Sequence, residues 1–210
     1  MTSQATNGSR RVRLAIFDYG AGNLHSLVKS VVADDREISI ETDLRSAINA
    51  DVLVLPGVGA FGAAARAMET GRSSLASALE DGLPCLGICL GMQLLFDASE
   101  EGEGNGIGFL QGNVTRLRTQ TVPHMGWNDI EWRDSSTQAD QLQTAYFANA
   151  YICQPDDESV VQASTTHQQT TFASVVRRAN TVGVQFHPEK SSSAGRAYIN
   201  AVIEDLLQCK

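Results

Sequence analysis

Short apolar runs alternate with stretches of helical character through the first half of the chain. Strand candidates lie at residues 13–18, 38–41, 51–56 and 84–88, and helix candidates lie at 24–33, 60–68, 74–81 and 90–96. The run at 51–56 (DVLVLP) is nearly continuous in apolar residues, which is typical of a strand covered on both faces. Strands that alternate with helices predict a parallel sheet with helices on both sides.

The pattern changes near residue 113. Strand-like segments joined by polar turns follow at 114–117, 129–132, 145–147, 160–163, 172–177 and 182–185, and an amphipathic helix at 194–207 closes the chain. This order predicts antiparallel strands added to the sheet in the C-terminal half, with a polar loop at 134–141. No linker or repeat is visible. We therefore predict one α/β domain at 11–210, with a mostly parallel, doubly wound sheet, after a flexible leader at 1–10.

Composition and charge narrow the classes of function. The 210 residues are 42% hydrophobic and 19% charged, which is ordinary for a globular protein, and the formal net charge is −8. An acidic chain is a poor partner for phosphate backbones, so we expect no nucleic acid. No apolar run reaches the roughly 18–20 residues of a membrane span, so we expect no membrane segment.

The opening residues lack the apolar region of a secretory signal, which favours the cytoplasm, although two arginines and two serines leave organelle targeting as the alternative. Four cysteines stand at positions 85, 89, 153 and 209. They form no C-x-x-C pair and no Cys/His pair at zinc-finger spacing, so we predict no metal site. Their even number says little about disulfides, and the reducing cytosol is the default compartment. The question is then whether one of them is a nucleophile.

The most informative turn is Gly87-Ile88-Cys89-Leu90-Gly91, between a predicted strand and a predicted helix. A nucleophile between two glycines at such a turn sits on a strained backbone with close neighbours on both sides. The N-terminus of the following helix favours a thiolate, and the next backbone amide is placed to donate to an oxyanion. The alternative is a buried structural cysteine before a tight turn.

A general base for this thiol is expected at His187, which follows an apolar strand in Gln185-Phe186-His187-Pro188-Glu189. The proline fixes the backbone, and Glu189 lies two residues on, within reach of the imidazole. The other three histidines have no such company and are interpreted as structural: His25, His124 and His167.

The glycines of Gly57-x-Gly59-x-x-Gly62 match a dinucleotide-binding fingerprint when read mechanically. However, they follow a later strand rather than the first, and no acidic residue ends a strand about 20 residues on. The alternative is that Gly57 and Val58 present backbone amides to the same oxyanion as Leu90. We therefore predict no cofactor.

Five segments together carry a resemblance to a known family: FDYGAGNLHSL (17–27), LPGVGAFG (55–62), LGICLGMQLLF (86–96), VPHMGWN (122–128) and GVQFHPEKS (183–191). The chain from about residue 13 to 207 resembles the class I (triad) glutamine amidotransferases. Within them it is similar to the glutaminase subunits of imidazole glycerol phosphate synthase, from histidine biosynthesis. The resemblance implies the class I glutamine amidotransferase fold and domain.

The resemblance also implies roles for single residues. Cys89 would attack the side-chain amide of glutamine and carry a glutamyl thioester, while His187 manages the protons and Glu189 orients His187. The amino acid end of the substrate would be held by Gln93, for which a solvated helix residue is the alternative. The oxyanion would be held by the backbone amides of Leu90 and of Gly57 or Val58.

One stretch departs from the family. Where members commonly carry a histidine and a small hydroxyl residue after a Tyr-Phe pair, this chain has Asn149 and Ala150. We expect both positions to lie at the glutamine site. If the segment contacts glutamine through its backbone, the change is tolerated, whereas a side-chain contact would alter binding or coupling to the partner.

In this family ammonia passes to a (β/α)8 cyclase subunit, which makes imidazole glycerol phosphate and AICAR. Such a barrel needs about 250 residues, so the partner must be a separate polypeptide and the complex a heterodimer. For Trp127, core packing is the alternative to an interface role. Positions matching the family's interface are Asn23, Met125, Trp127, Tyr146 and Lys190.

Three other interpretations were weighed. A different cysteine hydrolase of similar fold is disfavoured by Glu189 and Gln93. Another amidotransferase subunit is disfavoured by the PGVGAF and HMGWN segments. A catalytically silent regulatory relative is disfavoured by the complete Cys–His–Glu set, although Asn149 and Ala150 keep it open.

Overall fold

The computed structural model describes residues 10–20, 24–134 and 142–208. Positions 1–9 of the expected leader, and 135–141 of the expected polar loop, lie outside the described residues. Arg10, the last residue of the expected leader, is described and contacts Asp51.

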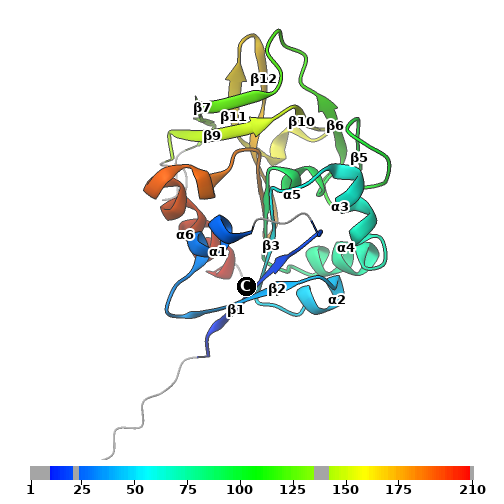
Figure 1. Cartoon of the computed structure of the whole chain (residues 1–210), viewed down its shortest axis with the longest axis vertical. Coiled ribbons are helices and arrows are strands. Elements are labelled where there is room, and N and C mark those ends of the chain that lie inside the picture. The colour runs from blue at the N-terminus through cyan, green and yellow to red at the C-terminus, as the bar shows by residue number, and fades with distance from the viewer. Residues whose placement is uncertain (1–9, 21–23, 135–141, 209–210) are drawn as a thin grey trace, which may run out of the picture.

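An eight-stranded sheet forms the centre of the molecule (Figure 1). The first five strands in spatial order pair in parallel and the last three add antiparallel pairs, which confirms the predicted fold class. The spatial order is β2 (Arg36–Glu41), β1 (Val12–Phe17), β3 (Val52–Leu55), β4 (Cys85–Ile88), β13 (Thr181–Val184), β12 (Thr170–Arg178), β11 (Val161–His167) and β8 (Glu131–Trp132).

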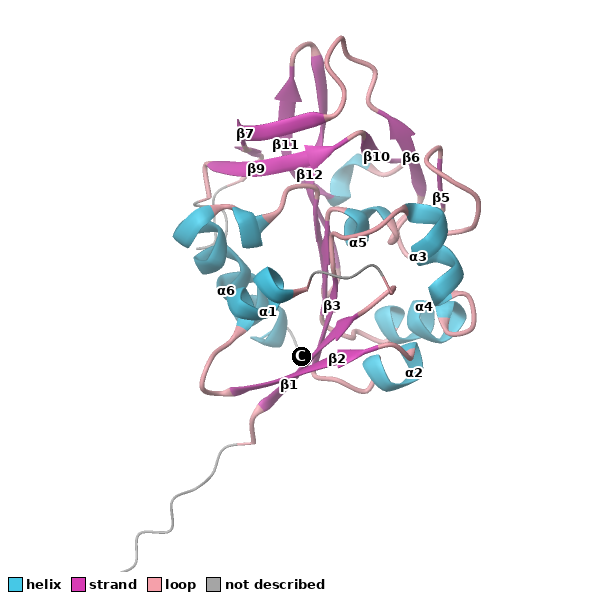
Figure 2. Ribbon diagram, in the orientation of Figure 1, coloured by secondary structure: helices cyan, strands magenta, loops and turns pink. Residues whose placement is uncertain are grey.

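Helices cover both faces of this sheet (Figure 2). One face carries α1 (His25–Val31) and α6 (Ser192–Gln208), and the other carries α2 (Leu44–Ala47), α3 (Phe61–Met68) and α4 (Arg72–Glu80). The period of two along a strand produces the two cores, because successive side chains point to opposite faces. In β1, Leu14 and Ile16 pack with α1 and α6, whereas Ala15 and Phe17 pack with α3 and α4.

Two smaller sheets and several short elements lie beyond the carboxyl ends of the parallel strands (Figure 1). One sheet has the order β10 (Tyr151–Pro155), β6 (Gly112–Arg116) and β5 (Ala98–Ser99), and the other pairs β7 (His124–Asp129) with β9 (Thr144–Asn149). The short helices are α5 (Leu90–Gln93) and the 3-10 helices η2 (Glu158–Val160) and η3 (Pro188–Lys190).

Two predicted elements differ from the structure. The strand expected at 129–132 is the end of β7 followed by β8, which pair with different strands, so the chain changes sheet at Ile130. The helix expected at 90–96 ends at Gln93, because the next amides, from Leu95 and Phe96, bond to carbonyls only three residues back and close the helix in tight turns.

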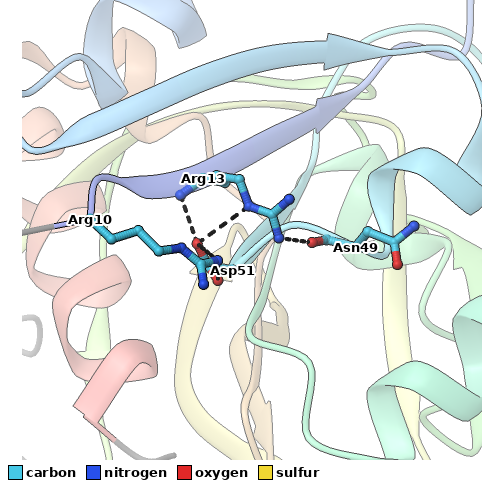
Figure 3. A network of polar contacts seen from close by, with 4 residues as sticks. All are labelled: Arg10, Arg13, Asn49 and Asp51. Atoms are coloured by element: carbon cyan, nitrogen blue, oxygen red, sulfur yellow. Dashed lines mark hydrogen bonds and ion pairs between the residues drawn. The ribbon is translucent and has the colours of Figure 1, made fainter.

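At the amino ends of the strands, a polar cluster joins β1 to the start of β3 (Figure 3). Asp51 accepts from the backbone N–H of Arg13 at 2.9 Å and from the guanidinium of Arg10 at 3.0 Å. The guanidinium of Arg13 also donates to the carbonyl of Asn49. These contacts lie at the end of the sheet opposite to the carboxyl ends, where ligands bind in open α/β folds, so we assign them to register and not to chemistry.

Candidate active site

Cys89 occupies the turn between β4 and α5 with a positive φ of 47° and a ψ of −102°. A residue with a Cβ adopts such a conformation only when its surroundings hold it there. The surroundings are visible at Gly91, where an added Cβ would stand 2.0 Å from the carbonyl oxygen of Leu55 in β3. The helix after the cysteine is therefore pressed onto the neighbouring strand, and the turn cannot relax.

The backbone amide of Leu90 is the first of α5. An amide at the start of a helix has no acceptor within the helix, so it is available to an external oxygen. Since α5 is only one turn long, its dipole adds less to the stability of a negative sulfur than the predicted longer helix would.

His187 reaches the same place from β13. This strand pairs in parallel with β4 in a register that sets Val184 beside Ile88, so both strands end side by side. The imidazole Nδ1 lies 2.8 Å from Oε1 of Glu189, and the two side chains are only 3% and 7% exposed. A buried carboxylate at this distance fixes the ring and stabilises its protonated form.

The pKa of His187 is raised from 6.5 to about 10. Burial alone lowers it, because it disfavours the charged ring, but the neighbouring Cys89 sulfur and the Glu189 carboxylate outweigh that effect. At neutral pH the ring is therefore an imidazolium that faces the sulfur of Cys89, which is the arrangement of activated cysteine nucleophiles.

The other described cysteines lie in different surroundings. Burial raises the pKa of the thiols of Cys85 and Cys153, so both stay protonated and unreactive. Cys209 lies outside the described residues. Among the cysteines that the structure describes, Cys89 alone faces an imidazole.

The glycine-rich loop after β3 lies directly against this pair. A Cβ added at Gly57 would stand 2.9 Å from Cε1 of His187 and 3.0 Å from Cβ of Cys89. Beyond the loop, α3 begins at Phe61, whose backbone N–H donates to Glu101 at 2.9 Å. The side chains of Cys89 and His187 therefore occupy the space beside Gly57. The partly buried Val58 packs against the core.

Two of the three predicted substrate residues, Gln93 and Asn149, meet at one carbonyl oxygen. Gln93 is buried on α5, and its Nε2 donates to the Tyr151 carbonyl at 3.2 Å. The side chain of Asn149 donates to the same oxygen at 3.1 Å, and the carbonyl of Ala150 accepts from Leu117 at 2.8 Å. The side chain that departs from the family pattern is thus engaged in a local backbone contact.

Three of the predicted interface residues, exposed Met125 and Trp127 and half-buried Tyr146, form an exposed patch on β7 and β9. Met125 and Trp127 are 65% and 55% exposed, which excludes core packing as the reason for this tryptophan. The Tyr146 ring, opposite Trp127 in the register of the two strands, meets it edge to face with centroids 6.4 Å apart. Lys190 is exposed at the end of η3. Asn23 lies outside the described residues.

This patch shares backbone contacts with the segment that carries His187. The backbone N–H of His187 donates to the Tyr146 carbonyl at 2.8 Å, and the Tyr146 N–H donates to Oγ of Ser191 at 2.9 Å. That hydroxyl in turn donates to the His187 carbonyl at 2.7 Å. The exposed patch and the imidazole are therefore linked by one strand.

Sequence reasoning missed three residues of this region. Ser191 ties η3 to β9, Glu101 caps α3 behind the glycine-rich loop, and Gln185 donates from Nε2 to Sγ of Cys89 at 3.5 Å. Ser191 and Gln185 lie inside the segment GVQFHPEKS, so their proximity to His187 in sequence was the available signal.

The remaining histidines lie apart from this centre. His124 stacks on His167 and Phe147 with centroids 4.2 and 4.8 Å away. Burial, and then the neighbouring His167, lower the pKa of His124 to about 4, so it is neutral at physiological pH. His25 is exposed at the start of α1.

Within the described ranges, no group of three or more His, Cys, Asp or Glu side chains is arranged to hold a metal ion. Nor is any helix in those ranges long and apolar enough to cross a membrane.

Comparisons with known proteins identify the family of this chain. A family model described as class-I glutamine amidotransferase matches residues 15–204. The imidazole glycerol phosphate synthase subunit HisH of Gloeothece citriformis is 38% identical over 92% of this chain and 96% of its own. HisH of Aquifex aeolicus is 43% identical, over 88% and 92%.

Among solved structures, PurLQS from Thermotoga maritima superposes with a TM-score of 0.72 at 17% identity. The superposition covers 93% of this chain and 99% of that one, and at this identity it supports the fold alone. The family-model match and the two curated relatives carry the narrower assignment: this chain belongs to the class I glutamine amidotransferases, in the family of the imidazole glycerol phosphate synthase subunit HisH.

Proposed function

We infer that this chain is the glutaminase subunit of imidazole glycerol phosphate synthase in histidine biosynthesis. It hydrolyses glutamine to glutamate and ammonia, and the ammonia serves a cyclase that makes imidazole glycerol phosphate and AICAR. Family membership supports the reaction. The observation that carries the site is the strained Cys89 beside the buried His187–Glu189 pair.

In the proposed chemistry, Sγ of Cys89 attacks the side-chain carbonyl carbon of glutamine. The imidazolium of His187 gives its proton to the amide nitrogen, the C–N bond breaks, and ammonia leaves a glutamyl thioester. The neutral imidazole then takes a proton from water, whose oxygen attacks the thioester. The C–S bond breaks, glutamate leaves and the sulfur is again a thiolate. Glu189 stabilises the imidazolium at the start and end of this cycle.

The carbonyl oxygen becomes negative in both tetrahedral intermediates. We assign its stabilisation to the backbone amide of Leu90 and to a backbone amide of the loop at Gly57 or Val58. Gly57 supports this role because its Cα lies against both Cys89 and His187. Backbone donors of this kind are fixed before the reaction and need no reorganisation when charge develops.

We assign the amino acid end of glutamine to Gln93 and to the backbone of the stretch at Asn149 and Ala150. Nε2 of Gln93 donates to two protein oxygens, so its Oε1 is the atom suited to a substrate ammonium. Nδ2 of Asn149 is engaged with the Tyr151 carbonyl, which supports a backbone contact with glutamine at this position.

We propose that the ammonia passes to a separate, HisF-like (β/α)8 cyclase subunit in a heterodimer. The docking surface is the exposed patch of Met125, Trp127 and Tyr146, with Lys190 on the neighbouring η3. Asn23, which lies outside the described residues, is assigned to this surface from the family resemblance alone. Exposed aromatic residues are typical anchors of protein interfaces. A dry interface also suits the chemistry, since ammonia that enters neutral water is protonated and loses its nucleophilicity. The free thiols of Cys85, Cys89 and Cys153 suit the reducing cytoplasm, where we place the enzyme.

The test uses Cys89→Ala together with a cyclase subunit and its ribonucleotide substrate. We expect loss of synthesis from glutamine but unchanged synthesis from added ammonium salt, because the cyclase needs only the nucleophile. Cys153→Ala is the matched control, and we expect its glutaminase turnover to stay within a few-fold. Loss of both activities in Cys89→Ala would indicate a structural cysteine, and full glutamine-dependent synthesis would exclude it as nucleophile.

A further inference from the structure

Gln185 stands one residue beyond β13 and is fully buried. Its backbone N–H donates to the Ser174 carbonyl at 2.9 Å, which continues the pairing with the neighbouring strand β12. The side chain extends to the catalytic turn, where Nε2 lies 3.5 Å from Sγ of Cys89. A buried side-chain amide is costly unless its groups are hydrogen-bonded, so this placement needs a reason.

The direction of this amide is set by its neighbours. The Tyr151 carbonyl can only accept, so Gln93 must turn its Nε2 toward it at 3.2 Å. The same Nε2 lies 3.4 Å from the side chain of Gln185, which must therefore present its Oε1. With its oxygen held by Gln93, Gln185 has only its N–H groups to offer to the sulfur.

A hydrogen-bond donor that faces the sulfur of Cys89 stabilises it most when the sulfur carries a negative charge. The one-turn helix α5 gives less dipole support than a long helix. When the thioester is then hydrolysed, the sulfur must depart as a thiolate, and an amide N–H aimed at it stabilises that charge. Hydrogen bonds to charged groups are stronger than those between neutral groups.

We propose that Gln185 is a further catalytic residue, whose side-chain N–H stabilises the Cys89 thiolate and whose orientation is imposed by Gln93. This proposal rests on the proposed function, in which Cys89 is the nucleophile. It also gives Gln93 a second role, because the residue assigned to substrate orients the donor to the sulfur.

The first arm of the test does not use catalysis. Wild-type protein, Gln185→Met and Gln185→Glu are treated with iodoacetamide at a series of pH values that reaches the acidic range in which the thiolate fraction limits the rate, and the label on the peptide that contains Cys89 is measured there by mass spectrometry over time. Methionine has a similar volume without a donor, so we expect alkylation to slow by about tenfold. Glutamate keeps the shape and places a negative charge beside the sulfur, so we expect slower alkylation still.

The second arm measures glutamine hydrolysis with the liganded cyclase subunit. We expect kcat for Gln185→Met to fall by about tenfold or more, with KM for glutamine changed by less than about threefold. In a double-mutant cycle with Gln93→Met, the effects of the two substitutions on kcat should be non-additive. Gln185→Met already removes the donor that Gln93→Met would only misorient. The matched control is Ser174→Ala, a buried position on β12 whose hydroxyl has no partner among the described residues, and it should behave as wild type.

Wild-type alkylation and wild-type kcat in a folded Gln185→Met would overturn the proposal, and so would faster alkylation in Gln185→Glu than in Gln185→Met. If Gln185→Met does not fold, the isosteric Gln185→Glu decides alone, with wild-type alkylation as the overturning result. The proposed function fails separately, if the wild-type protein with its partner releases no glutamate. The alkylation arm still decides the role of Gln185 in that case.

Discussion

At the scale of single residues, the catalytic turn sets two opposite demands on the backbone. Cys89 carries a side chain in a conformation that favours glycine, and Gly57 lacks a side chain where one would collide with Cys89 and His187, the proposed nucleophile and base. The positive φ stores strain in the backbone of Cys89. The missing side chain of Gly57 lets the backbone of its loop come close to Cys89 and His187.

We expect Gly57→Ala to fold and to lose most glutaminase activity. Its new methyl group would press on Cε1 of His187 and Cβ of Cys89, and movement of either by a few tenths of an ångström misaligns the pair. The measurement is kcat for glutamine hydrolysis with the cyclase present, with a loss of about 10²-fold or more expected.

Gly102→Ala is the control for Gly57→Ala, since its added methyl group would meet the nearest atom at an ordinary 3.4 Å. A Gly57→Ala protein with full activity would show that the loop stands back from the reacting atoms.

The His187–Glu189 pair predicts a pH dependence of stability. The folded pKa of about 10 lies above the unfolded value of 6.5, so protonation stabilises the folded state fully below pH 6.5. This contribution is lost as the pH rises through about 10. Because Glu189 is one cause of the raised pKa, we expect the free energy of unfolding of Glu189→Gln to change less between pH 7 and pH 10 than that of the wild type.

Urea unfolding at both pH values measures this difference for Glu189→Gln. Glu37→Gln, at an exposed position of β2, should retain the wild-type slope. Equal slopes in all three proteins would mean that the imidazolium is not held by this carboxylate.

At the scale of elements, α5 acts as a wedge against the carboxyl ends of the central strands. The contact is backbone to backbone at Gly91 and Leu55, and side chain to backbone at Met92 and Gly183. Such contacts leave no volume for adjustment, because the partners are main-chain atoms in a packed interior.

We expect Gly91→Ala to destabilise the whole fold, in contrast to Gly57→Ala. Its Cβ would lie 2.0 Å from the Leu55 carbonyl oxygen, so α5 must leave β3. The free energy of unfolding should fall by more than about 3 kcal/mol, as for other changes that force a core apart. Thermal unfolding followed by circular dichroism measures it, and a melting temperature within a few degrees of the wild type would contradict the wedge.

The central elements could be predicted because their residues are buried on both faces. The apolar runs at β1, β3 and β4 lie within one or two residues of the predicted strands. Other elements, such as α2 and β7, were not predicted, for physical reasons. The helix α2 has only four residues, too few for a helical period, and Asp43 at its start caps it locally. In β7, exposed Met125 and Trp127 reverse the usual pattern, and Gly126 adopts a φ of 131°.

The site was predictable where chemistry marks a residue. A cysteine between glycines and a histidine followed by an acid could be recognised, and the structure brings Cys89, His187 and Glu189 together. The roles of Gln185 and Ser191 could not be recognised, because side-chain amides and hydroxyls serve many structural purposes. Gln185 contacts a residue that is distant in the sequence, and Ser191 bonds to a backbone carbonyl. Gln185 reaches a sulfur 96 positions away, which only the pairing of β4 with β13 reveals.

At the scale of the whole molecule, the β7–β9 sheet lies at the opposite end from β2 (Figure 1). This end carries the exposed patch and also holds the backbone of His187 through Tyr146. A partner that binds the patch, as we propose, would therefore contact a strand that is hydrogen-bonded to the segment of His187.

We expect Trp127→Ala to weaken binding of the cyclase subunit by about tenfold or more, as for an aromatic anchor of an interface. Val32→Ala is the control, since Val32 is 63% exposed in the segment that leads from α1 to β2. Titration calorimetry with the cyclase measures both variants. Equal affinities would place the docking surface elsewhere.

The pairing of β4 with β13 has a consequence for the history of such proteins. The distance between the sulfur and the imidazole is set by two aligned strands, while the long segment between them builds the smaller sheets and the outward patch. That segment can therefore lengthen, shorten or change its surface while the hydrolytic centre keeps its dimensions. One ancestral glutaminase can in this way adapt to different partner enzymes through changes in the segment that contacts the partner.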